Sequence, residues 1–147
     1  MADRHWDPRD KYIESLIREY SNWSVEVAVR QHTLGSLVIW AHREIERIAD
    51  LSAEELLELK EVMKDVEAAI SKSPAFKADR FNYLQLGNHT HHLHIHVIPR
   101  YKTARTLLGK TWRDNRWGNP PEYIFEESDW IHVREVKRLL LEHWPQS

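Results

Sequence analysis

Four histidines fall within six residues in the stretch HHLHIH, residues 91–96. Three of them, His92, His94 and His96, alternate with apolar residues, so in a strand they would share one face. A neutral imidazole nitrogen attacks phosphorus well, and its attack divides a difficult displacement into two easier steps through a phosphohistidine. Such a nucleophile needs one ring nitrogen free and the other hydrogen-bonded to an acceptor, which fixes the tautomer. The row therefore favours nucleophilic catalysis at a phosphate.

Two other interpretations stay open: a solvated sheet face, and a metal site built on neutral imidazole. In a strand the α-carbons of His92 and His96 would stand about 13 Å apart, whereas zinc needs each ligand nitrogen within about 2.1 Å. Two of the three histidines could share an ion, but the chain has no cysteine and no HExxH motif to complete the ligand set. We therefore expect no dedicated metal site.

Composition limits the class of protein. With 147 residues, 41% of them hydrophobic and 30% charged, the chain predicts one globular domain with a substantial core. A formal charge of −2 gives no basic field, so we expect no nucleic acid as a partner. No apolar segment resembles a signal peptide or approaches the ~20 residues of a membrane span. Together with the absence of cysteine, this predicts a cytoplasmic protein without membrane contact.

The N-terminal part predicts a helix followed by a hairpin. Asp7-Pro8 is a helix-start signal, and a modest apolar stripe follows it, so residues 1–21 are expected to form a helical extension. Alternating valines in WSVEVAVR and the apolar run SLVIWAH then predict two paired strands over residues 23–42, with QHTLG as the turn between them.

A long helix and two further strands follow. Ser52 and Glu55 have capping-box spacing, and apolar residues then recur at three- and four-residue steps until Pro74 ends the helix. Residues 81–86 and 93–98 are predicted as strands, with a Gly-Asn turn after the first. The second of these strands carries the histidine row, and its other face is expected to pack on the helix.

The C-terminal part, residues 102–147, is predicted to be a loop to residue 126 and then a helix capped by Ser128 or Asp129. Basic residues and tryptophans interleave in the loop, but we expect the tryptophans to anchor it and the charges to be solvated. Overall the pattern predicts an α+β fold in one domain, 1–147. Its antiparallel sheet packs against the long helix and is completed by the C-terminal helix.

The stretch HHLHIHVIPRY resembles the signature of the histidine-triad (HIT) family, His-φ-His-φ-His-φ-φ with φ apolar. The upstream stretch LGSLVIWAHREIERIADLSAEELLEL also resembles the family's glycine, apolar strand and helix-opening segment. Together these stretches make residues 22–101 similar to a HIT core. The resemblance implies a HIT-like fold and a homodimer whose sheet crosses both subunits.

In function, the resemblance implies a nucleotide hydrolase or transferase that acts at an α-phosphate through a nucleotidyl-histidine. It implies His94 as the nucleophile, His92 as the residue that fixes its orientation, and His96 as a contact of the phosphate or leaving group. Polar residues upstream are implied as substrate contacts: Asn82, Gln85 and Asn88. The expected substrate is a purine nucleoside polyphosphate or phosphoramidate with an AMP-type product. No cofactor is required, although Mg²⁺ would accompany a polyphosphate.

The chain also departs from the family pattern. Ser36 stands where many members have a further histidine, and Ala28 stands where a ribose-binding asparagine is expected. A second frequent histidine position holds Glu44, with His42 two residues away. These departures leave two rival functions open: a nucleotide-binding module without turnover, and a histidine-based metal-binding protein.

Overall fold

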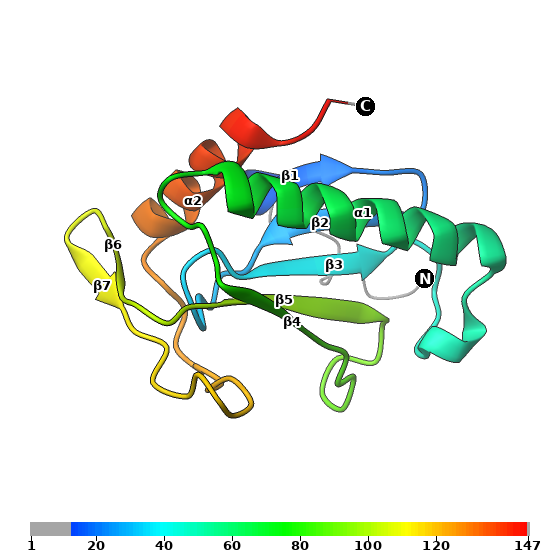
Figure 1. The fold of residues 1–147 in the computed structure, drawn as a ribbon. Helices are drawn as coiled ribbons and strands as arrows, with labels where there is room; N and C mark the ends of the chain where they lie inside the picture. Colours follow the sequence, from blue (N-terminus) through cyan, green and yellow to red (C-terminus); the bar gives the residue numbers. More distant parts are fainter. Residues whose placement is uncertain (1–12, 147) are drawn as a thin grey trace.

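The computed structural model describes residues 13–146, and a five-stranded sheet forms its centre (Figure 1). The strands have the spatial order β1-β2-β3-β5-β4, and all neighbouring pairs are antiparallel. Their bounds are Leu16–Glu19 for β1, Trp23–Val27 for β2, Leu37–Ala41 for β3, Arg80–Leu84 for β4 and His94–Arg100 for β5. The strand that carries the histidine row, β5, is therefore held on both sides, by β3 and β4.

Two helices lie on one side of this sheet (Figure 1). The helices are α1 at Ala53–Lys72 and α2 at Trp130–His143, and short 3-10 turns occur at Ile13–Ser15 (η1) and Ile48–Asp50 (η2). The predicted capping box of α1 is confirmed, because the Ser52 hydroxyl accepts from the Glu55 N–H and the Glu55 carboxylate accepts from the Ser52 N–H. Asp129 caps α2 by accepting a hydrogen bond from the N–H of Ile131.

The two faces of the sheet have different roles. On the helix face, the apolar residues that alternate with the histidines pack into the main core and are at most 3% exposed: Leu93, Ile95 and Val97. This packing confirms the prediction from the sequence. The opposite face carries the histidines, and the β3–β5 register sets Trp40 beside His94 and Val38 beside His96. The predicted α+β fold with an antiparallel sheet, a long helix and a C-terminal helix is therefore the fold observed.

The predicted N-terminal helix is wrong in the part that the structure describes. Leu16–Glu19 form the edge strand β1, which pairs with β2 and buries Ile17 in the core. The helical pattern rested on only three apolar residues, and strand pairing with core burial outweighs so weak a propensity. The remainder of the predicted helical extension, residues 1–12, lies outside the described residues.

The predicted loop after residue 101 contains a second, small sheet. Strands β6 at Arg105–Leu107 and β7 at Lys110–Trp112 form an antiparallel hairpin. Its two-residue turn places Leu108 and Gly109 at φ values of 48° and 81°, the left-handed conformation that tight hairpins require. The sequence signal was missed because leucine is an uncommon residue at such a position.

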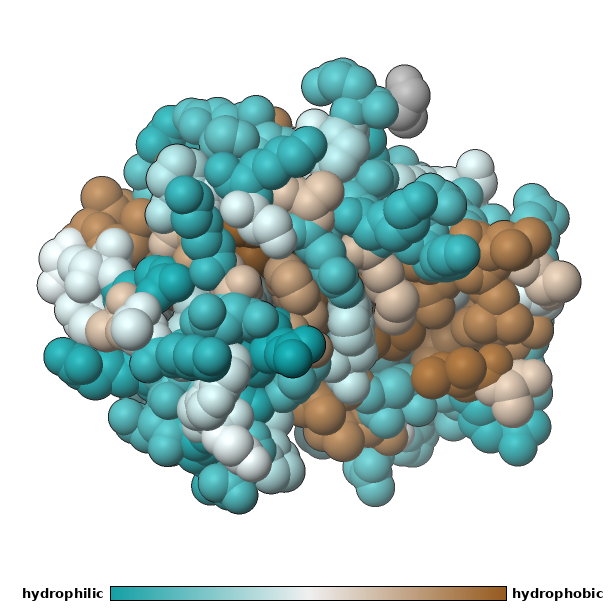
Figure 2. Space-filling view, viewed as in Figure 1, coloured by the Kyte–Doolittle hydropathy of each residue, from teal (hydrophilic) through white to brown (hydrophobic). Residues whose placement is uncertain are grey.

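An apolar area of the surface lies near the start of α1. Figure 2 shows it on the right of the view, where Figure 1 places the N-terminal end of α1. Large hydrophobic residues exposed in this part of the chain are Ile48, Leu56 and Leu57. Within residues 13–146, no helix is long and apolar enough to cross a membrane.

Candidate active site

A cavity of about 860 Å³ opens on the histidine face of the sheet. Strands β2, β3 and β5 form its floor, and its walls come from the loop after β2, the loop before β5 and a segment that precedes α2. Its lining includes His32, Trp40, Asn88, His94, His96, Tyr123 and Phe125. The structure therefore gathers two of the three predicted catalytic histidines around one space large enough for a nucleotide.

His94 has the hydrogen-bonding geometry that a nucleophilic imidazole needs. Its Nδ1 lies 2.8 Å from the backbone carbonyl oxygen of His92. Since a carbonyl only accepts, Nδ1 carries the proton and Nε2 keeps its lone pair. Burial lowers the pKa of His94, against a smaller opposing effect of this hydrogen bond, so the ring is neutral at pH 7. Nε2 makes no hydrogen bond to any other residue of the described chain and is left for the cavity.

His92 lies two residues before the start of β5, and its backbone carbonyl contacts the His94 ring. Its side-chain Nε2 lies 2.6 Å from the carbonyl oxygen of Ala41, at the end of β3, and therefore donates to it. This bond ties the backbone of His92 to β3. The His92 carbonyl, which accepts the hydrogen bond from His94 Nδ1, is thus held in place by the side chain of the same residue.

The third histidine has a neighbour that the sequence analysis did not identify. The ring of His96 packs edge-on against His94 at 5.1 Å and lies 6.2 Å from the ring of His32. Burial, with smaller effects of the His94 and His32 charges, lowers the pKa of His96 to about 4. Burial, with a smaller effect of Arg30, lowers the pKa of His32 to about 4 as well. At neutral pH the cavity therefore presents a group of uncharged imidazoles.

Trp40 supports His94 from the neighbouring strand. Its indole stacks on the imidazole, with ring centroids 4.7 Å apart and planes inclined by 24°. The indole Nε1 donates to a carboxylate oxygen of Glu26 at 2.6 Å, and the other Glu26 oxygen accepts from Ser15 at 2.8 Å. The plane of the His94 ring is thus fixed by a tryptophan that is itself hydrogen-bonded to Glu26 of β2.

Only one of the three predicted substrate contacts lines the cavity. Asn88 does so, in a loop where Gly87 adopts a φ of +73°. Asn82 is on the histidine face, but its Oδ1 accepts a hydrogen bond from Arg100 at 2.7 Å and it does not line the cavity. Gln85 does not line it either; its amide lies near the position that a Cβ on Gly87 would take.

The positions that depart from the family pattern have local roles. The Ser36 hydroxyl donates to the Thr33 carbonyl and accepts from the Thr33 N–H, which closes the turn between β2 and β3. His42 is bound by Ser24 and by the Ser21 carbonyl, and it does not line the cavity. Ala28 does line it, as a small apolar residue.

The segment before α2 forms one wall of the cavity and was predicted to be loop only. Four hydrogen bonds fasten residues 123–128 to the loop after β2. They run from Ile124 N–H to His32 Nδ1, from Arg30 Nε to the Phe125 carbonyl, from Ser128 N–H to the Val29 carbonyl and from Gln31 N–H to the Ser128 hydroxyl. Tyr123 and Phe125 remain 41% and 79% exposed, so their rings are accessible from the cavity.

Arg100 holds the loop that leads into this wall. Its guanidinium is 3% exposed and uses all five donors. They bind both carboxylate oxygens of Asp114, the Asn82 side chain and the carbonyls of Asn119 and Arg116. We call these five hydrogen bonds the Arg100 clamp. Because the clamp includes the Asn82 side chain, that side chain is not available to the cavity.

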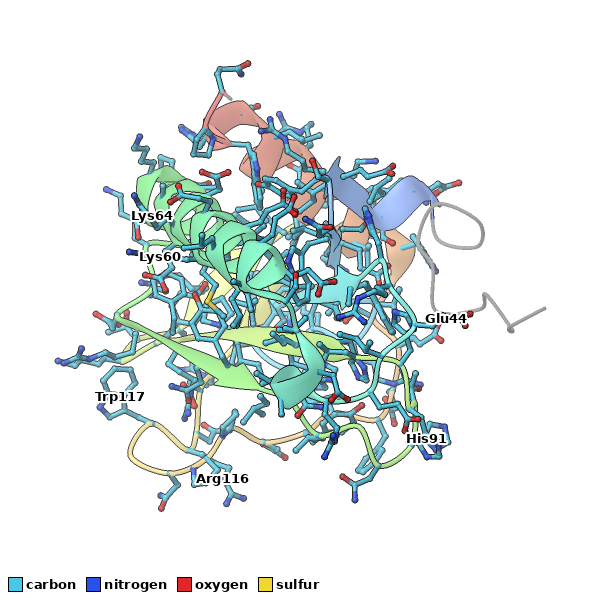
Figure 3. All side chains as sticks on the ribbon, turned by 90° about the vertical axis from the view of Figure 1, so that its right-hand side faces the viewer. Glu44, Lys60, Lys64, His91, Arg116 and Trp117 are labelled. Carbon is cyan, nitrogen blue, oxygen red and sulfur yellow. The ribbon has the colours of Figure 1, made fainter. Side chains whose placement is uncertain are left out.

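The basic residues and tryptophans at positions 110–117 lie away from the cavity. Trp112 is buried, as expected of an anchor, whereas Trp117 is 37% exposed and does not anchor the loop in the core. Figure 3 shows Arg116 and Trp117 on the outer part of the loop. The Lys102 ammonium lies 5.5 Å from the Trp117 ring centre, and Arg116 Nε donates to the Pro120 carbonyl. Neither Arg116 nor Trp117 lines the cavity.

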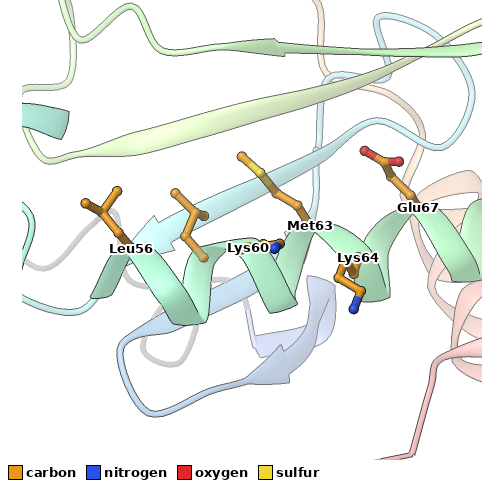
Figure 4. Close-up of a pocket in the computed structure, with 6 residues that line it drawn as sticks. Leu56, Lys60, Met63, Lys64 and Glu67 are labelled. Atoms are coloured by element: carbon orange, nitrogen blue, oxygen red, sulfur yellow. The ribbon is translucent and has the colours of Figure 1, made fainter. Parts of the chain in front are cut away.

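A second hollow, of about 270 Å³, lies on α1 and contains none of the histidines (Figure 4). Apolar residues of α1 form much of it, among them Leu56, Leu59 and Met63. Glu67 at its end accepts a hydrogen bond from the Tyr83 hydroxyl of β4, so the hollow adjoins the edge of the sheet. Among residues 13–146, no group of three acidic or histidine side chains is placed to hold a metal ion.

Comparison with known proteins identifies the family. The model of the HIT domain matches residues 28–103, more than half of the chain. The chain belongs to the HIT family. Its match includes the whole histidine row and the strand β3 that pairs with β5, which agrees with the resemblance seen in the sequence. A search of curated proteins found no match.

Solved HIT structures share the fold at low sequence identity. A hypothetical histidine triad nucleotide-binding protein from Sulfolobus tokodaii is 20% identical, with a TM-score of 0.69 over 88% of this chain and 82% of its own. A HIT-like protein involved in cell-cycle regulation from Bartonella henselae is 15% identical, with a TM-score of 0.68 over 97% and 98%. A zinc-bound histidine triad family protein from Mycobacterium smegmatis is 19% identical, with a TM-score of 0.61 over 87% and 81%. These likenesses show the fold.

Proposed function

We propose that this HIT protein is a cytoplasmic nucleotide hydrolase that cleaves at the α-phosphate of a purine nucleoside polyphosphate or phosphoramidate. One observation carries the proposal: His94 is a neutral imidazole whose Nδ1–H is bound to the His92 carbonyl and whose Nε2 is left for the cavity. A fixed tautomer with an available lone pair is what attack on phosphorus requires. The cysteine-free composition suits a reducing compartment.

In the first step, His94 Nε2 attacks the α-phosphorus and forms a phosphorus–nitrogen bond. The bond to the leaving group breaks, and the leaving group takes the electron pair and a proton. That proton comes from solvent, or the nitrogen of a phosphoramidate takes it up before the bond breaks, so that a neutral amine leaves. The His94 ring becomes positively charged, and its Nδ1–H then binds the His92 carbonyl more strongly than the neutral ring does. The charge of the intermediate is thus stabilised by a group already in place.

In the second step, water attacks the same phosphorus from the cavity. The phosphorus–nitrogen bond breaks, His94 recovers its lone pair, and a nucleoside monophosphate leaves with an oxygen from water. The water proton passes to solvent or to the phosphate. His96, which packs against His94, is proposed to contact the phosphate oxygens or the leaving group. Asn88, in the loop before β5, is proposed as a further substrate contact. Asn82 and Gln85 do not line the cavity, so their side chains would have to change conformation to contact the substrate.

The nucleobase is proposed to stack on the wall formed by Tyr123 and Phe125. These rings are 5.0 Å apart and are the accessible aromatic surfaces of the cavity, whereas Trp40 is only 9% exposed and is covered by His94. A base stacked on an aromatic side chain is stabilised by about 1–3 kcal/mol.

The charges of the cavity favour a substrate whose leaving group carries little negative charge. The lining includes Arg30 against the carboxylates of Glu26 and Glu127, and His32, His94 and His96 are neutral. A polyphosphate leaving group would need more positive charge than this, supplied for example by Mg²⁺ bound to the substrate. We therefore expect the phosphoramidate to be the better substrate.

We also propose that the protein forms a homodimer, as membership of the family suggests. Strand β4 is an edge of the main sheet in the described residues, and the apolar hollow of α1 adjoins it. A second copy that extends the sheet at β4 would cover both features. Light scattering during size exclusion should give twice the mass of the 147-residue chain, and a monomer at all concentrations would contradict the proposal.

The proposed activity is tested by turnover of a fluorogenic adenosine phosphoramidate and of diadenosine tetraphosphate, each with and without EDTA. Phosphoramidate turnover that resists EDTA and is lost in His94→Ala is expected. The matched control is His91→Ala, since His91 is exposed, does not line the cavity and lies at the tip of its loop in Figure 3. Turnover by His94→Ala at the wild-type rate would contradict the proposal.

The second candidate is a nucleotide-binding module without turnover. It is favoured by Ser36, which replaces a histidine found in many family members and whose hydroxyl is engaged with Thr33. This candidate predicts AMP binding with no cleavage of either substrate. Activity lost to EDTA on the phosphoramidate, and restored by zinc, would instead support a metal-dependent protein like the zinc-bound relative.

A further inference from the structure

His32 occupies a position in the cavity that the proposed reaction does not yet use. It comes from the loop after β2, lines the same cavity as His94 and His96, and is 7% exposed. Its ring lies 6.2 Å from the ring of His96 and 4.4 Å from that of Tyr123. It is thus a fourth imidazole beside the reacting histidines, contributed by a different element.

The tautomer of His32 is set by the wall segment. The backbone N–H of Ile124 donates to His32 Nδ1 at 2.9 Å. An atom that accepts a hydrogen bond carries no proton, so in the neutral ring the proton is on Nε2. No residue of the described chain accepts a hydrogen bond from this Nε2–H, and it is not a buried unpaired atom. The remaining acceptor for it is a ligand or water in the cavity.

An uncharged N–H donor in this place suits a phosphate oxygen. The rings of His32 and His96 stand nearly at right angles, with an interplanar angle of 68°. Both imidazoles line the cavity beside His94, His96 from β5 and His32 from the loop after β2. Hydrogen bonds from preset donors to an anionic oxygen stabilise charge without reorganisation. The donor is preset because Ile124 and the ring contact with Tyr123 hold the imidazole.

We infer that His32 is a phosphate-binding residue, which donates Nε2–H to a nonbridging oxygen of the phosphate at His94. Ile124 is the positioning residue that fixes its tautomer. The inference rests on the proposed function, because it assumes that a nucleotide phosphate occupies the cavity. It adds the loop after β2 and the segment before α2 to the elements that recognise the phosphate.

Two substitutions test the roles of the two ring nitrogens of His32 separately. Asparagine places an amide oxygen near the position of Nδ1, so His32→Asn keeps an acceptor for the Ile124 N–H but removes the donor to the cavity. Glutamine is one carbon longer and places an amide N–H near the position of Nε2, so His32→Gln keeps the donor. The measurement is the calorimetric affinity of each full-length variant for AMP and for adenosine, which lacks the phosphate.

His32→Asn is expected to weaken AMP binding about 10- to 100-fold, the usual effect of removing one hydrogen bond to a charged group. Adenosine binding should change less than threefold, and His32→Gln should recover most of the AMP affinity. In nitrogen NMR of the free wild-type protein, His32 should carry its proton on Nε2. Equal losses for AMP and adenosine would indicate a merely structural role and overturn the inference.

The outcomes also separate this inference from the proposed function. Wild-type protein that binds AMP and turns over a substrate, with unchanged AMP affinity in His32→Asn, overturns the inference alone. Wild-type protein that neither binds AMP nor cleaves either substrate overturns both.

Discussion

The imidazole of His94 and the indole of Trp40 stack at 4.7 Å between ring centres, across the β3–β5 pairing. The contact restricts rotation of the His94 ring about its side-chain torsions, while the Nδ1 hydrogen bond to the His92 carbonyl fixes its tautomer. The orientation of the His94 ring therefore depends on two neighbouring strands as well as on the histidine row itself.

Substitution of Trp40 should lower turnover according to how much of the stack remains. Trp40→Phe keeps an aromatic ring against His94 and should lower kcat by less than about fivefold, since an aromatic contact contributes about 0.5–1.5 kcal/mol. Trp40→Leu removes the aromatic ring and should lower kcat roughly tenfold further. Trp112→Leu is the control, because Trp112 is buried outside the cavity and packs on His132. Equal kcat for the phenylalanine and leucine variants would refute an orienting role for the stack.

Removal of the Phe125 ring should weaken nucleotide binding with little effect on stability. Phe125 is 79% exposed, so Phe125→Ala loses little buried surface. If the base stacks there, KM should rise about tenfold while kcat changes little. The control is Leu108→Ala. Leu108 is in the β6–β7 turn, is 53% exposed and does not line the cavity, so its removal should leave KM unchanged. Steady-state kinetics on the phosphoramidate decide the point, and an unaltered KM in Phe125→Ala would place the base elsewhere.

The neutral histidines should make the fold sensitive to mild acid. Burial lowers the pKa values of His32 and His96 to about 4 in the folded chain, against about 6.5 in an unfolded chain. Below pH 6.5 the unfolded chain takes up protons that the folded chain does not, so the free energy of unfolding falls until the pH passes 4. Each shift corresponds to stability on the order of 3 kcal/mol, present above pH 6.5 and lost towards pH 4.

Urea unfolding between pH 4 and pH 7 measures this effect. In His32→Asn one of the two titrating groups is gone, so the pH dependence should be shallower than in the wild type. His91→Ala removes an exposed histidine and should keep the wild-type slope. A wild-type unfolding free energy that does not change between pH 7 and pH 4 would mean that these histidines are not held neutral.

The elements that position His94 were largely predictable from the sequence, because local patterns determine them. The capping box at Ser52 and Glu55 and the alternation of histidines with apolar residues each specify an element within a few residues. The wall of the cavity was not predictable in the same way. His32 and Ile124 are 92 positions apart in the chain, and neither has a periodic pattern around it.

Other errors have physical causes of the same kind. The weak apolar stripe around Ile17 suits either a helix or an edge strand, and pairing with β2 decides it. Asn82 lies on the histidine face, but its side chain is hydrogen-bonded to Arg100, which also binds residues 114–119. Local sequence shows which side chains share a face, but long-range contacts determine which of them stay available to a ligand.

Neutralising one partner of the buried Arg100–Asp114 pair should destabilise the fold strongly. Although burial alone raises the pKa of the Asp114 carboxyl, hydrogen bonds from Arg100 and from the N–H groups of Tyr101 and Arg116 hold it below its usual value. Asp114→Asn leaves the Arg100 charge buried without compensation, so the free energy of unfolding should fall by about 3–5 kcal/mol. Chemical denaturation at pH 7 measures this change.

The control for this variant is Arg138→Met, which removes exposed ion pairs with Glu135 and Glu142 on α2. It should leave the unfolding midpoint nearly unchanged, because exposed pairs contribute little. An Asp114→Asn protein as stable as Arg138→Met would show that the clamp does not hold the loop.

The proposed reaction requires that His94 becomes covalently attached to the nucleotide. Rapid acid-free quenching of the wild-type protein with the adenosine phosphoramidate, followed by peptide mass spectrometry, detects this intermediate. We expect a peptide containing residues 91–100 that is heavier by one adenylyl group, with the modification on His94. The adduct should form within one turnover, and His94→Ala should lack it. Turnover at the wild-type rate without any such adduct, or with the adenylyl group on another residue, would show that His94 is not the nucleophile.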